Sequence, residues 1–325
     1  MTVRTSSQMI AAGPEAVAEA AKCLAGGGLT AFPTETVYGL GADATNSDAI
    51  ARLYQAKGRP SFNPLIAHVA DLPAARKIAR FGADAEKLAA AFWPGPLTLV
   101  LPRSPDCTVA DLATAGLETI GVRIPSHPVA LAILKALGRP VVAPSANRSG
   151  HVSPTTAQHV HADLGDQIDL IVDGDATHVG VESTIVGCFA RATLLRPGGV
   201  PRAEIEAVLG YSLESPQQQG EAGQPLAPGM LASHYAPRAK VRLNATSVAP
   251  GEALLAFGAE KIPGMDKAAA ILNLSQTSDP VEAAARLFGF LRKLDTTGAA
   301  RIAVMPIPDD GLGEAINDRL RRAAA

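Results

Sequence analysis

The chain has 325 residues, of which 47% are hydrophobic and 18% charged, so it is long enough for two globular domains with a sizeable core. Its formal charge of −2, from 29 Lys and Arg against 31 Asp and Glu, argues against a protein that coats nucleic acid non-specifically. The three cysteines, Cys23, Cys107 and Cys188, form no CxxC pair, which indicates neither a disulfide framework nor a zinc ribbon. No window approaches the roughly 18 apolar residues of a membrane span, and we expect a cytoplasmic protein.

Helix and strand patterns alternate along the first part of the chain. Residues 14–25 predict a helix that ends at three glycines, and 29–32 a buried strand. A second helix over 47–58 is expected to start at a Ser47 cap and to stop at Gly58. A further helix is expected at 127–138, and further strands at 63–69, 97–101, 119–125, 140–144, 170–174, 183–187 and 193–199. This alternation predicts an α/β or α+β fold with a mixed sheet.

The composition changes after a helix pattern at 202–210. Residues 211–237 are rich in Gln, Gly, Pro and Ser without apolar periodicity, which is typical of a linker. Beyond it, strands at 253–258, 269–275 and 301–308 and helices at 279–298 and 311–325 predict a small parallel α/β domain. We therefore expect a catalytic domain over 1–210, a linker or lid over 211–238 and an α/β domain over 239–325.

The first chemical motif is FPTETVYGLGADA, in which a strand runs into Thr34, Glu35, Thr36 and Tyr38 beside two glycines. Hydroxyls at a strand end next to glycine suit a small polar ligand. A simple hairpin or strand-end turn is the alternative, and this stretch alone favours it.

The second motif, KGRPSFNPLIAH, places Lys57 and Arg59 at the end of a helix, where Pro60 and Pro64 stiffen the chain. The two cations either complement the carboxyl end of the helix or bind a polyphosphate. His68, inside an apolar run, is by itself typical of a core histidine.

The third motif, GVRIPSHP, puts Arg123 inside a strand pattern. A buried arginine needs an anionic partner. The sequence leaves open whether that partner is a ligand or a distant Asp or Glu.

The fourth motif, PSANRSGHVSPT, predicts a helix start with Ser153 as the cap and Pro154 in the first helical position. Exposed N–H groups there favour an anion. Ser145 and Asn147 lie at a strand end and can touch a ligand, whereas Arg148 is expected to face solvent.

The fifth motif, VESTIVG followed by LLRPGGV, contributes Ser183, Thr184 and Arg196. The sequence contains no GxxxxGK[ST], HExxH, GxSxG or kinase signature, so an ATP site would be of an uncommon kind.

Six motifs in one order, PTETVYGLG, KGRPxxNPL, FWPGPLT, GVRIPSHP, PSANRSGxxSPT and VESTIV…LLRPG, resemble the YrdC-like family of threonylcarbamoyl-AMP synthases. The stretch PGMLASHYAP and the α/β end resemble the longer, two-domain branch of that family. The resemblance implies a twisted mixed sheet with helices and a concave, positively lined cavity. It also implies a smaller Rossmann-like domain, joined by a linker that closes over the cavity.

The resemblance implies a nucleotidyltransferase that converts L-threonine, bicarbonate or CO2, and ATP to threonylcarbamoyl-AMP and pyrophosphate. The product would serve threonylcarbamoyladenosine formation in tRNA, a transfer made by partner transferase proteins, with at most weak tRNA contact by this chain. Mg²⁺ is expected with ATP, held mainly by the phosphates. The carbamate oxygen itself can attack the α-phosphorus, so the chemistry needs no protein nucleophile.

The resemblance also implies site residues. Those on the ATP side are Lys57, Arg59, Asn63, Thr119, Asn147, Thr155 and Arg196, with Tyr235 as a lid. Those on the threonine side are Thr36, His68, Arg123, Ser145 and Ser183, with Arg123 as the carboxylate fork. Catalysis is assigned to Lys57, Arg59 and Arg196, no residue to a metal, and only His68 is a candidate general base. Glu35 and Glu182 either point away from the site or pair with its arginines.

Two alternatives remain. An RNA-binding module would use the same cations on phosphates, but only 4% of residues are aromatic and the charge balance is acidic. A carbamoyl-transfer enzyme with another acceptor would carry zinc-finger and acylphosphatase-like regions, for which the chain has too few cysteines and no extension.

Overall fold

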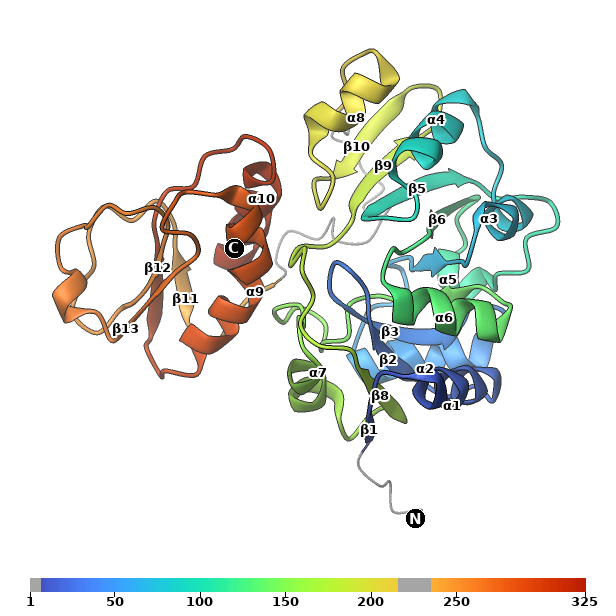
Figure 1. Cartoon of the computed structure of the whole chain (residues 1–325), viewed down its shortest axis with the longest axis horizontal. Helices are drawn as coiled ribbons and strands as arrows, with labels where there is room; N and C mark the ends of the chain where they lie inside the picture. The colour runs from blue at the N-terminus through green and yellow to red at the C-terminus, as the bar shows by residue number, and fades with distance from the viewer. Residues whose placement is uncertain (1–6, 216–234) are drawn as a thin grey trace.

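The structure is a computed structural model that describes residues 7–215 and 235–325. These residues form a ten-stranded sheet and a separate four-stranded sheet, which stand side by side in Figure 1. The ten strands pair in both parallel and antiparallel senses, and all pairs of the smaller sheet are parallel. The predicted mixed sheet with a smaller parallel α/β unit is therefore confirmed.

The large sheet has the strand order β1-β8-β2-β3-β7-β4-β6-β5-β9-β10. Its strands are β1 (Gln8–Ala11), β2 (Thr30–Pro33), β3 (Tyr38–Asp43), β4 (Ile66–His68), β5 (Leu97–Pro102), β6 (Thr119–Arg123), β7 (Val141–Val142), β8 (Leu170–Asp173), β9 (Thr184–Cys188) and β10 (Ala192–Arg196). The helices of this part are α1 (Pro14–Ala25), α2 (Ser47–Lys57), α3 (Leu72–Ile78), α4 (Ala83–Phe92), α5 (Asp111–Thr114), α6 (Pro128–Leu137), α7 (Ala157–Leu164) and α8 (Arg202–Leu209).

Strands β2 and β3 form an antiparallel hairpin in which Phe32 pairs with Gly39 and Pro33 with Tyr38. The residues that follow β2 therefore form a hairpin turn. This is the alternative that the first motif, taken by itself, favours. The turn is closed by Thr34, whose hydroxyl donates to the Val37 carbonyl oxygen at 2.7 Å. This turn holds Glu35 and Thr36 inside the protein, where both side chains are buried.

The starts of two helices differ from the prediction. Asn46, rather than Ser47, caps α2, because its side chain accepts hydrogen bonds from the Asp48 and Ala49 amides. Helix α7 begins at Ala157 with Thr156 as its cap, and not at Ser153 and Pro154. The helix N-terminus that was expected to attract an anion beside Ser153 is therefore displaced along the chain.

The smaller sheet has the order β11-β14-β12-β13, from β11 (Lys240–Arg242), β12 (Ala253–Ala256), β13 (Ala270–Asn273) and β14 (Arg301–Val304). It carries the short helix η1 (Met265–Lys267) and the longer helices α9 (Pro280–Asp295) and α10 (Gly313–Ala324). Figure 1 places α9 and α10 between the two sheets. Their apolar faces pack with Val37, Val152 and Val181, which belong to loops of the large sheet.

The predicted linker falls mostly on residues 216–234, which lie outside the described residues. The domain limits at 210 and 238 stay predictions. Among the described residues, no helix combines the length and the apolar character needed to cross a membrane.

Candidate active site

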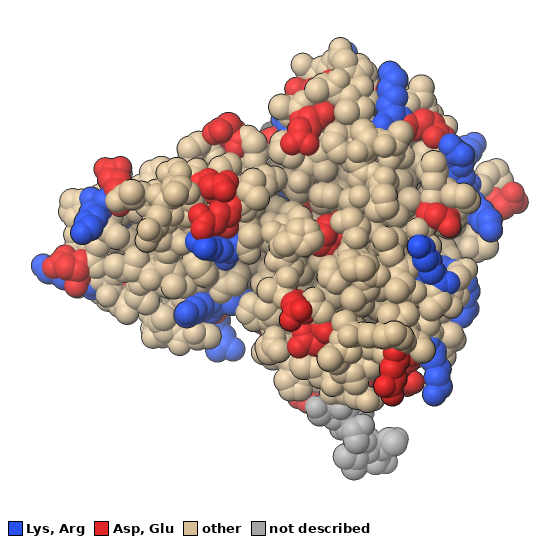
Figure 2. Space-filling model, in the orientation of Figure 1, with Lys and Arg blue, Asp and Glu red and all other residues tan. Residues whose placement is uncertain are grey.

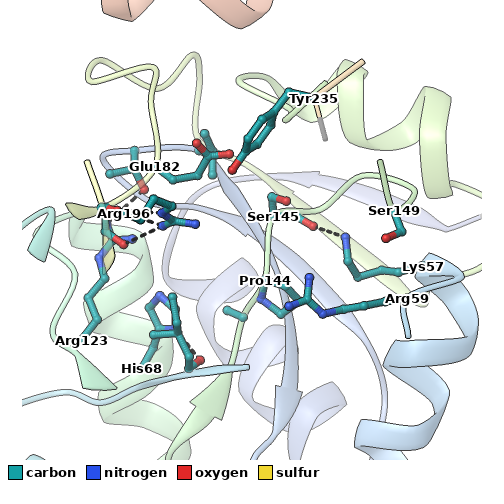
Figure 3. A pocket seen from close by; sticks show the side chains of 15 residues that line it. Lys57, Arg59, His68, Arg123, Pro144, Ser145, Ser149, Glu182, Arg196 and Tyr235 are labelled. Carbon is teal, nitrogen blue, oxygen red and sulfur yellow. Dashed lines mark hydrogen bonds between the residues drawn. The ribbon is translucent and has the colours of Figure 1, made fainter. Parts of the chain in front are cut away.

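Loops and strand ends of the large sheet converge on one pocket (Figure 3). In that view Lys57 and Arg59 enter from one side, Arg123 and Arg196 from the other, and Tyr235 lies above them. The pocket is lined by Thr36, Val37, Lys57, Arg59, Ile66, His68, Arg123, Ala143, Pro144, Ser145, Ser149, Glu182, Ser183, Arg196 and Tyr235. Most of the predicted site residues, from five separate motifs, therefore meet here.

Lys57 is the last residue of α2 and is 3% exposed. Its Nζ donates to the carbonyl oxygens of Ser145 and Asn147, each at 2.5 Å. Burial, and then the neighbouring Arg59 charge, hold the pKa of Lys57 well below its usual value. The lysine thus fixes the loop after β7 to the end of α2.

Arg59 is also buried, and its guanidinium donates to the carbonyl oxygens of Asn63 and Pro64 at 3.3 and 3.0 Å. Burial lowers the pKa of Arg59 to about 10. Both cations therefore donate to neutral carbonyl oxygens within the described part of the chain. An anion in the pocket would supply the negative charge that these partners lack.

Arg123, at the end of β6, forms a buried ion pair with Glu35 across 2.6 Å. The same guanidinium nitrogen donates to Thr36 Oγ1 at 3.1 Å, and Nε donates to the Gly95 carbonyl oxygen at 3.3 Å. The structural ion pair that the sequence left open is therefore present. It holds the arginine at the pocket wall, and Glu35 is turned to Arg123 and to the Ser126 amide.

Arg196, at the end of β10, donates to the carbonyl oxygen of Ser183 from Nε and Nη2, at 3.2 and 2.9 Å. Its Nη2 also lies 3.3 Å from Ser183 Oγ, which in turn lies 2.7 Å from Thr98 Oγ1. Burial lowers the pKa of Arg196. The fifth motif is thereby joined into one buried polar cluster.

Glu182 lines the pocket beside Ser183 and pairs with Arg319 of α10, whose Nε lies 2.8 Å from Glu182 Oε2. Burial raises the pKa of Glu182, but the charges of Arg319 and Arg196 outweigh it and lower the pKa to about 2. Both acids of the motifs are thus paired with arginines.

His68, at the end of β4, is 2% exposed, and its Nδ1 lies 3.2 Å from the Ile66 carbonyl oxygen. Burial, and then the Arg123 charge, lower the pKa of His68 to about 3. The imidazole is consequently neutral near pH 7, in agreement with a core histidine that also lines the pocket.

Four predicted residues lie outside the pocket lining. Asn63 and Asn147 are buried, and their backbone carbonyl oxygens accept from Arg59 and Lys57. Their Oδ1 atoms have no hydrogen-bond partner among the described residues. Thr119 begins β6, at the opposite end of that strand from Arg123. Thr155 lies beside His159, whose Nδ1 is 3.4 Å from its Oγ1. The ATP roles of these four residues stay predictions.

Several lining residues and one charged partner were not predicted from the sequence. Val37, Ile66, Ala143, Pro144 and Ser149 line the pocket without a distinctive chemical signal. Arg319 did carry a signal. The buried residues of α10, Ala315, Ile316, Leu320 and Ala323, follow helical spacing, and Arg319 falls on that apolar face. An arginine on such a face requires a buried anionic partner.

Where a protein holds Mg²⁺ at a nucleotide site, one or two free carboxylates bind the ion together with phosphate oxygens and waters. Within residues 7–215 and 235–325, no three His, Cys, Asp or Glu side chains lie together as a metal site. The carboxylates at the pocket, Glu35 and Glu182, already pair with arginines. The donor set of these residues therefore does not fit a magnesium ion bound by the protein itself.

Two family models match the chain. One, described as "Telomere recombination", covers residues 22–198, and the other, "Threonylcarbamoyl-AMP synthase, C-terminal domain", covers 200–325. The threonylcarbamoyl-AMP synthase of Bacillus subtilis (strain 168) is 41% identical over 321 residues, which cover 95% of this chain and 92% of the relative. That of Pyrococcus abyssi is 42% identical over 316 residues, covering 92% and 91%. The crystal structure of P. abyssi Sua5 complexed with L-threonine matches 98% of both chains at a TM-score of 0.87 and 38% identity.

Proposed function

The chain belongs to the threonylcarbamoyl-AMP synthase family of enzymes, and we propose that it makes threonylcarbamoyl-AMP and pyrophosphate from L-threonine, bicarbonate or CO2, and ATP. The product then serves threonylcarbamoyladenosine formation in tRNA through separate transferase proteins. A cytoplasmic location follows from that role.

The observation that carries this proposal is the pair of buried cations, Lys57 and Arg59, which donate hydrogen bonds to carbonyl oxygens rather than to carboxylates. Desolvating a cation is costly unless an anion compensates. A triphosphate beside Lys57, Arg59 and Arg196 supplies that compensation. Tyr235 covers the same space, which fits a lid over the nucleotide.

L-threonine is assigned to the other side of the pocket. Arg123 is held rigid by Glu35, Thr36 and the Gly95 carbonyl oxygen, as a fork for a carboxylate must be. Thr36, His68, Ser145 and Ser183 provide short polar groups around it. The solved P. abyssi relative, which is complexed with L-threonine, supports an amino-acid side in this fold.

The reaction needs positioning rather than a protein nucleophile. The threonine amine and CO2 give a carbamate and release a proton to solvent. A carbamate oxygen then attacks the α-phosphorus of ATP, and the bond from that phosphorus to pyrophosphate breaks. Lys57, Arg59 and Arg196 stabilise the charge that develops on the phosphates and on the leaving pyrophosphate. Mg²⁺ enters with ATP as part of that substrate. His68 stays neutral and orients substrate rather than accepting a proton.

Pyrophosphate release by the purified chain tests the proposal. ATP and Mg²⁺ are supplied throughout, and L-threonine and bicarbonate are omitted in turn. We expect release only when both are present, and we expect folded Arg123→Ala to be impaired chiefly in its dependence on threonine. Release that is indifferent to threonine would overturn the proposal.

The lid assignment has its own test, because Tyr235 stacks on Phe288 of α9 with ring centroids 5.5 Å apart. Truncation before Pro228 removes both residues, and we expect faster loss of bound nucleotide and lower turnover. Tyr235→Phe is the matched control, since it keeps the stacked ring. Full activity in the truncated chain would refute the lid.

The RNA-binding alternative receives little support from the surface. On the face drawn in Figure 2, Lys and Arg side chains are scattered among Asp and Glu rather than gathered in one basic patch. An RNA-binding module would give tRNA affinity that falls steeply with salt in the absence of ATP.

A further inference from the structure

One side chain of the second unit reaches the pocket. Arg319 of α10 is 0% exposed and touches three groups around the site. Its Nε lies 2.8 Å from Glu182 Oε2, its Nη1 donates to the Pro197 carbonyl oxygen at 2.9 Å, and its guanidinium carbon lies 5.3 Å from the centre of the Tyr235 ring. Glu182 and Tyr235 line the pocket, and Pro197 follows Arg196 in the chain.

Packing alone does not explain an arginine at this position. The neighbouring buried residues of α10 are Ala315, Ile316, Leu320 and Ala323, and an apolar side chain would continue that face without desolvating a charge. Moreover, Arg319 Nη2 is buried and has no hydrogen-bond partner among the described residues. A charge at this place is therefore better explained by what it contacts.

The contact with Glu182 determines the charge at the pocket wall. Glu182 Oε1 accepts from the buried Ser153 hydroxyl at 2.5 Å, so the carboxylate also anchors the loop that follows Asn147. Without Arg319, Glu182 would be left with the charge of Arg196 alone, in a pocket that is proposed to bind ATP and a carboxylate. It would repel both substrates and compete with Ser183 for the Arg196 guanidinium.

Arg319 has a second acid, Asp318, at 2.7 Å, but Asp318 is independently paired with Arg322 at 3.1 Å. Removing Arg319 would therefore deprive Glu182 of its ion-pair partner and leave Asp318 with another.

We propose that Arg319 is a positioning residue of the active site, through which the C-terminal unit neutralises Glu182 and holds Ser153, Arg196 and Tyr235 in the arrangement that binds ATP. The inference rests on the proposed function where it is tested by kcat and KM. The affinity for ATP is measured by calorimetry and does not require that the chain turns over substrate.

Arg319→Met, Glu182→Gln, the double variant and Arg319→Lys test the proposal. Arg322→Met is the matched control. Arg322 lies about one turn further along the same helix, and its ion-pair partner is Asp318 rather than Glu182. For each folded variant, kcat, the KM values for ATP and L-threonine, and the ATP affinity are measured. We expect Arg319→Met to weaken ATP binding at least tenfold, Arg322→Met to leave it unchanged, and Arg319→Lys to fall between them.

The double variant separates positioning from a merely structural role. Glu182→Gln removes the uncompensated charge, so we expect it to recover most of the ATP affinity lost in Arg319→Met. Normal affinity and KM in folded Arg319→Met, or no recovery in the double variant, would overturn the inference. If Arg319→Met does not fold, Arg319→Lys with and without Glu182→Gln decides between the same two outcomes. Should the unmodified chain bind ATP but release no pyrophosphate, the proposed function fails while the calorimetry still decides the role of Arg319.

Discussion

Arg123 and Glu35 form an ion pair across 2.6 Å in which the side chains are 5% and 1% exposed. The pair joins the end of β6 to the turn between β2 and β3, two segments 88 residues apart in the chain. It fixes the proposed carboxylate fork in place before any substrate arrives. It also means that neither residue can be removed alone without leaving a buried charge.

This pair predicts a specific loss of stability in acid. Burial raises the pKa of Glu35, but the charge and hydrogen bond of Arg123 outweigh it and lower the pKa below 4.5. The resulting stabilisation is present above the unfolded pKa and is lost as the pH falls through the folded one. Urea unfolding at pH 7 and at a series of acidic pH values measures it. Glu35→Gln should be less stable at pH 7 and less sensitive to acid, whereas Glu19→Gln, which removes an exposed carboxylate, should match the unmodified chain.

Removing the arginine should be more damaging. Arg123→Ala leaves Glu35 buried without its cation, and loss of one partner of a buried pair costs about 3–5 kcal/mol. We expect a large drop in unfolding free energy, partly recovered in Arg123→Ala with Glu35→Gln. Equal stability of the single and double variants would contradict the coupling.

Lys57→Met should weaken ATP binding. The change removes the charge and frees the Ser145 and Asn147 carbonyl oxygens that Nζ holds. We expect the KM for ATP to rise about tenfold or more, equivalent to roughly 1.4 kcal/mol per tenfold. Lys135→Met is the matched control. Lys135 lies in the last turn of α6, as Lys57 lies in the last turn of α2, but Lys135 is exposed whereas Lys57 is buried. If Lys57→Met releases pyrophosphate with an unchanged KM for ATP, the lysine only holds the loop after β7 and does not bind ATP.

His68 should not set the pH dependence of turnover. Burial lowers its pKa to about 3, so the imidazole stays neutral near pH 7. In His68→Asn, the inflections in kcat/KM against pH should stay at the same pH values even if the rate falls. An inflection near pH ~6 that vanishes in the variant would identify His68 as a general base.

The same histidine makes the free energy of unfolding depend on pH in the same direction as Glu35 does. Its folded pKa is about 3 and its ordinary value is 6.5, so the unfolded histidine binds a proton first as the pH falls. Stability should therefore decline between these two pH values. His68→Asn should flatten that part of the urea-unfolding profile, and an unchanged slope would contradict the depressed pKa.

Gly180 should be intolerant of a side chain. It has a φ of +76°, and an added Cβ would lie 2.2 Å from the Ala284 carbonyl oxygen of α9. Gly180→Ala therefore has to push α9 away from the loop that leads to Glu182. We expect about 1–3 kcal/mol of destabilisation together with weaker ATP binding. Gly82→Ala is the control, since a Cβ there meets nothing within 4 Å. Identical thermal unfolding of the two variants would contradict this close packing.

Local patterns in the sequence predicted the fold class, and the resemblance to the family supplied the roles of most pocket residues. Helix α1 ends at glycines as predicted, and β4, β6 and β10 end in His68, Arg123 and Arg196, which gather at the pocket. The predicted start of α7 was wrong because Ser153 has a distant partner, Glu182, and Thr156 caps the helix instead. Helices α3 and α4 were not predicted.

Distant pairing accounts for what the sequence left open. Arg123 meets Glu35, and Glu182 meets Arg319 from 137 residues away, and neither pairing has a local pattern. Thr119 shows that residues close together in the sequence can also lie apart in the structure. It belongs to the same strand as Arg123, but a strand rises about 3.3 Å per residue, so four residues carry it to the far end of β6.

The most direct test of the central claim is to identify the product. The purified chain is incubated with ATP, Mg²⁺, L-threonine and ¹³C-bicarbonate, and the nucleotide fraction is examined by mass spectrometry. We expect threonylcarbamoyl-AMP that carries the ¹³C label and forms in step with pyrophosphate. The proposed function would be contradicted if pyrophosphate formed together with AMP alone and no nucleotide carried the ¹³C label even at the earliest times.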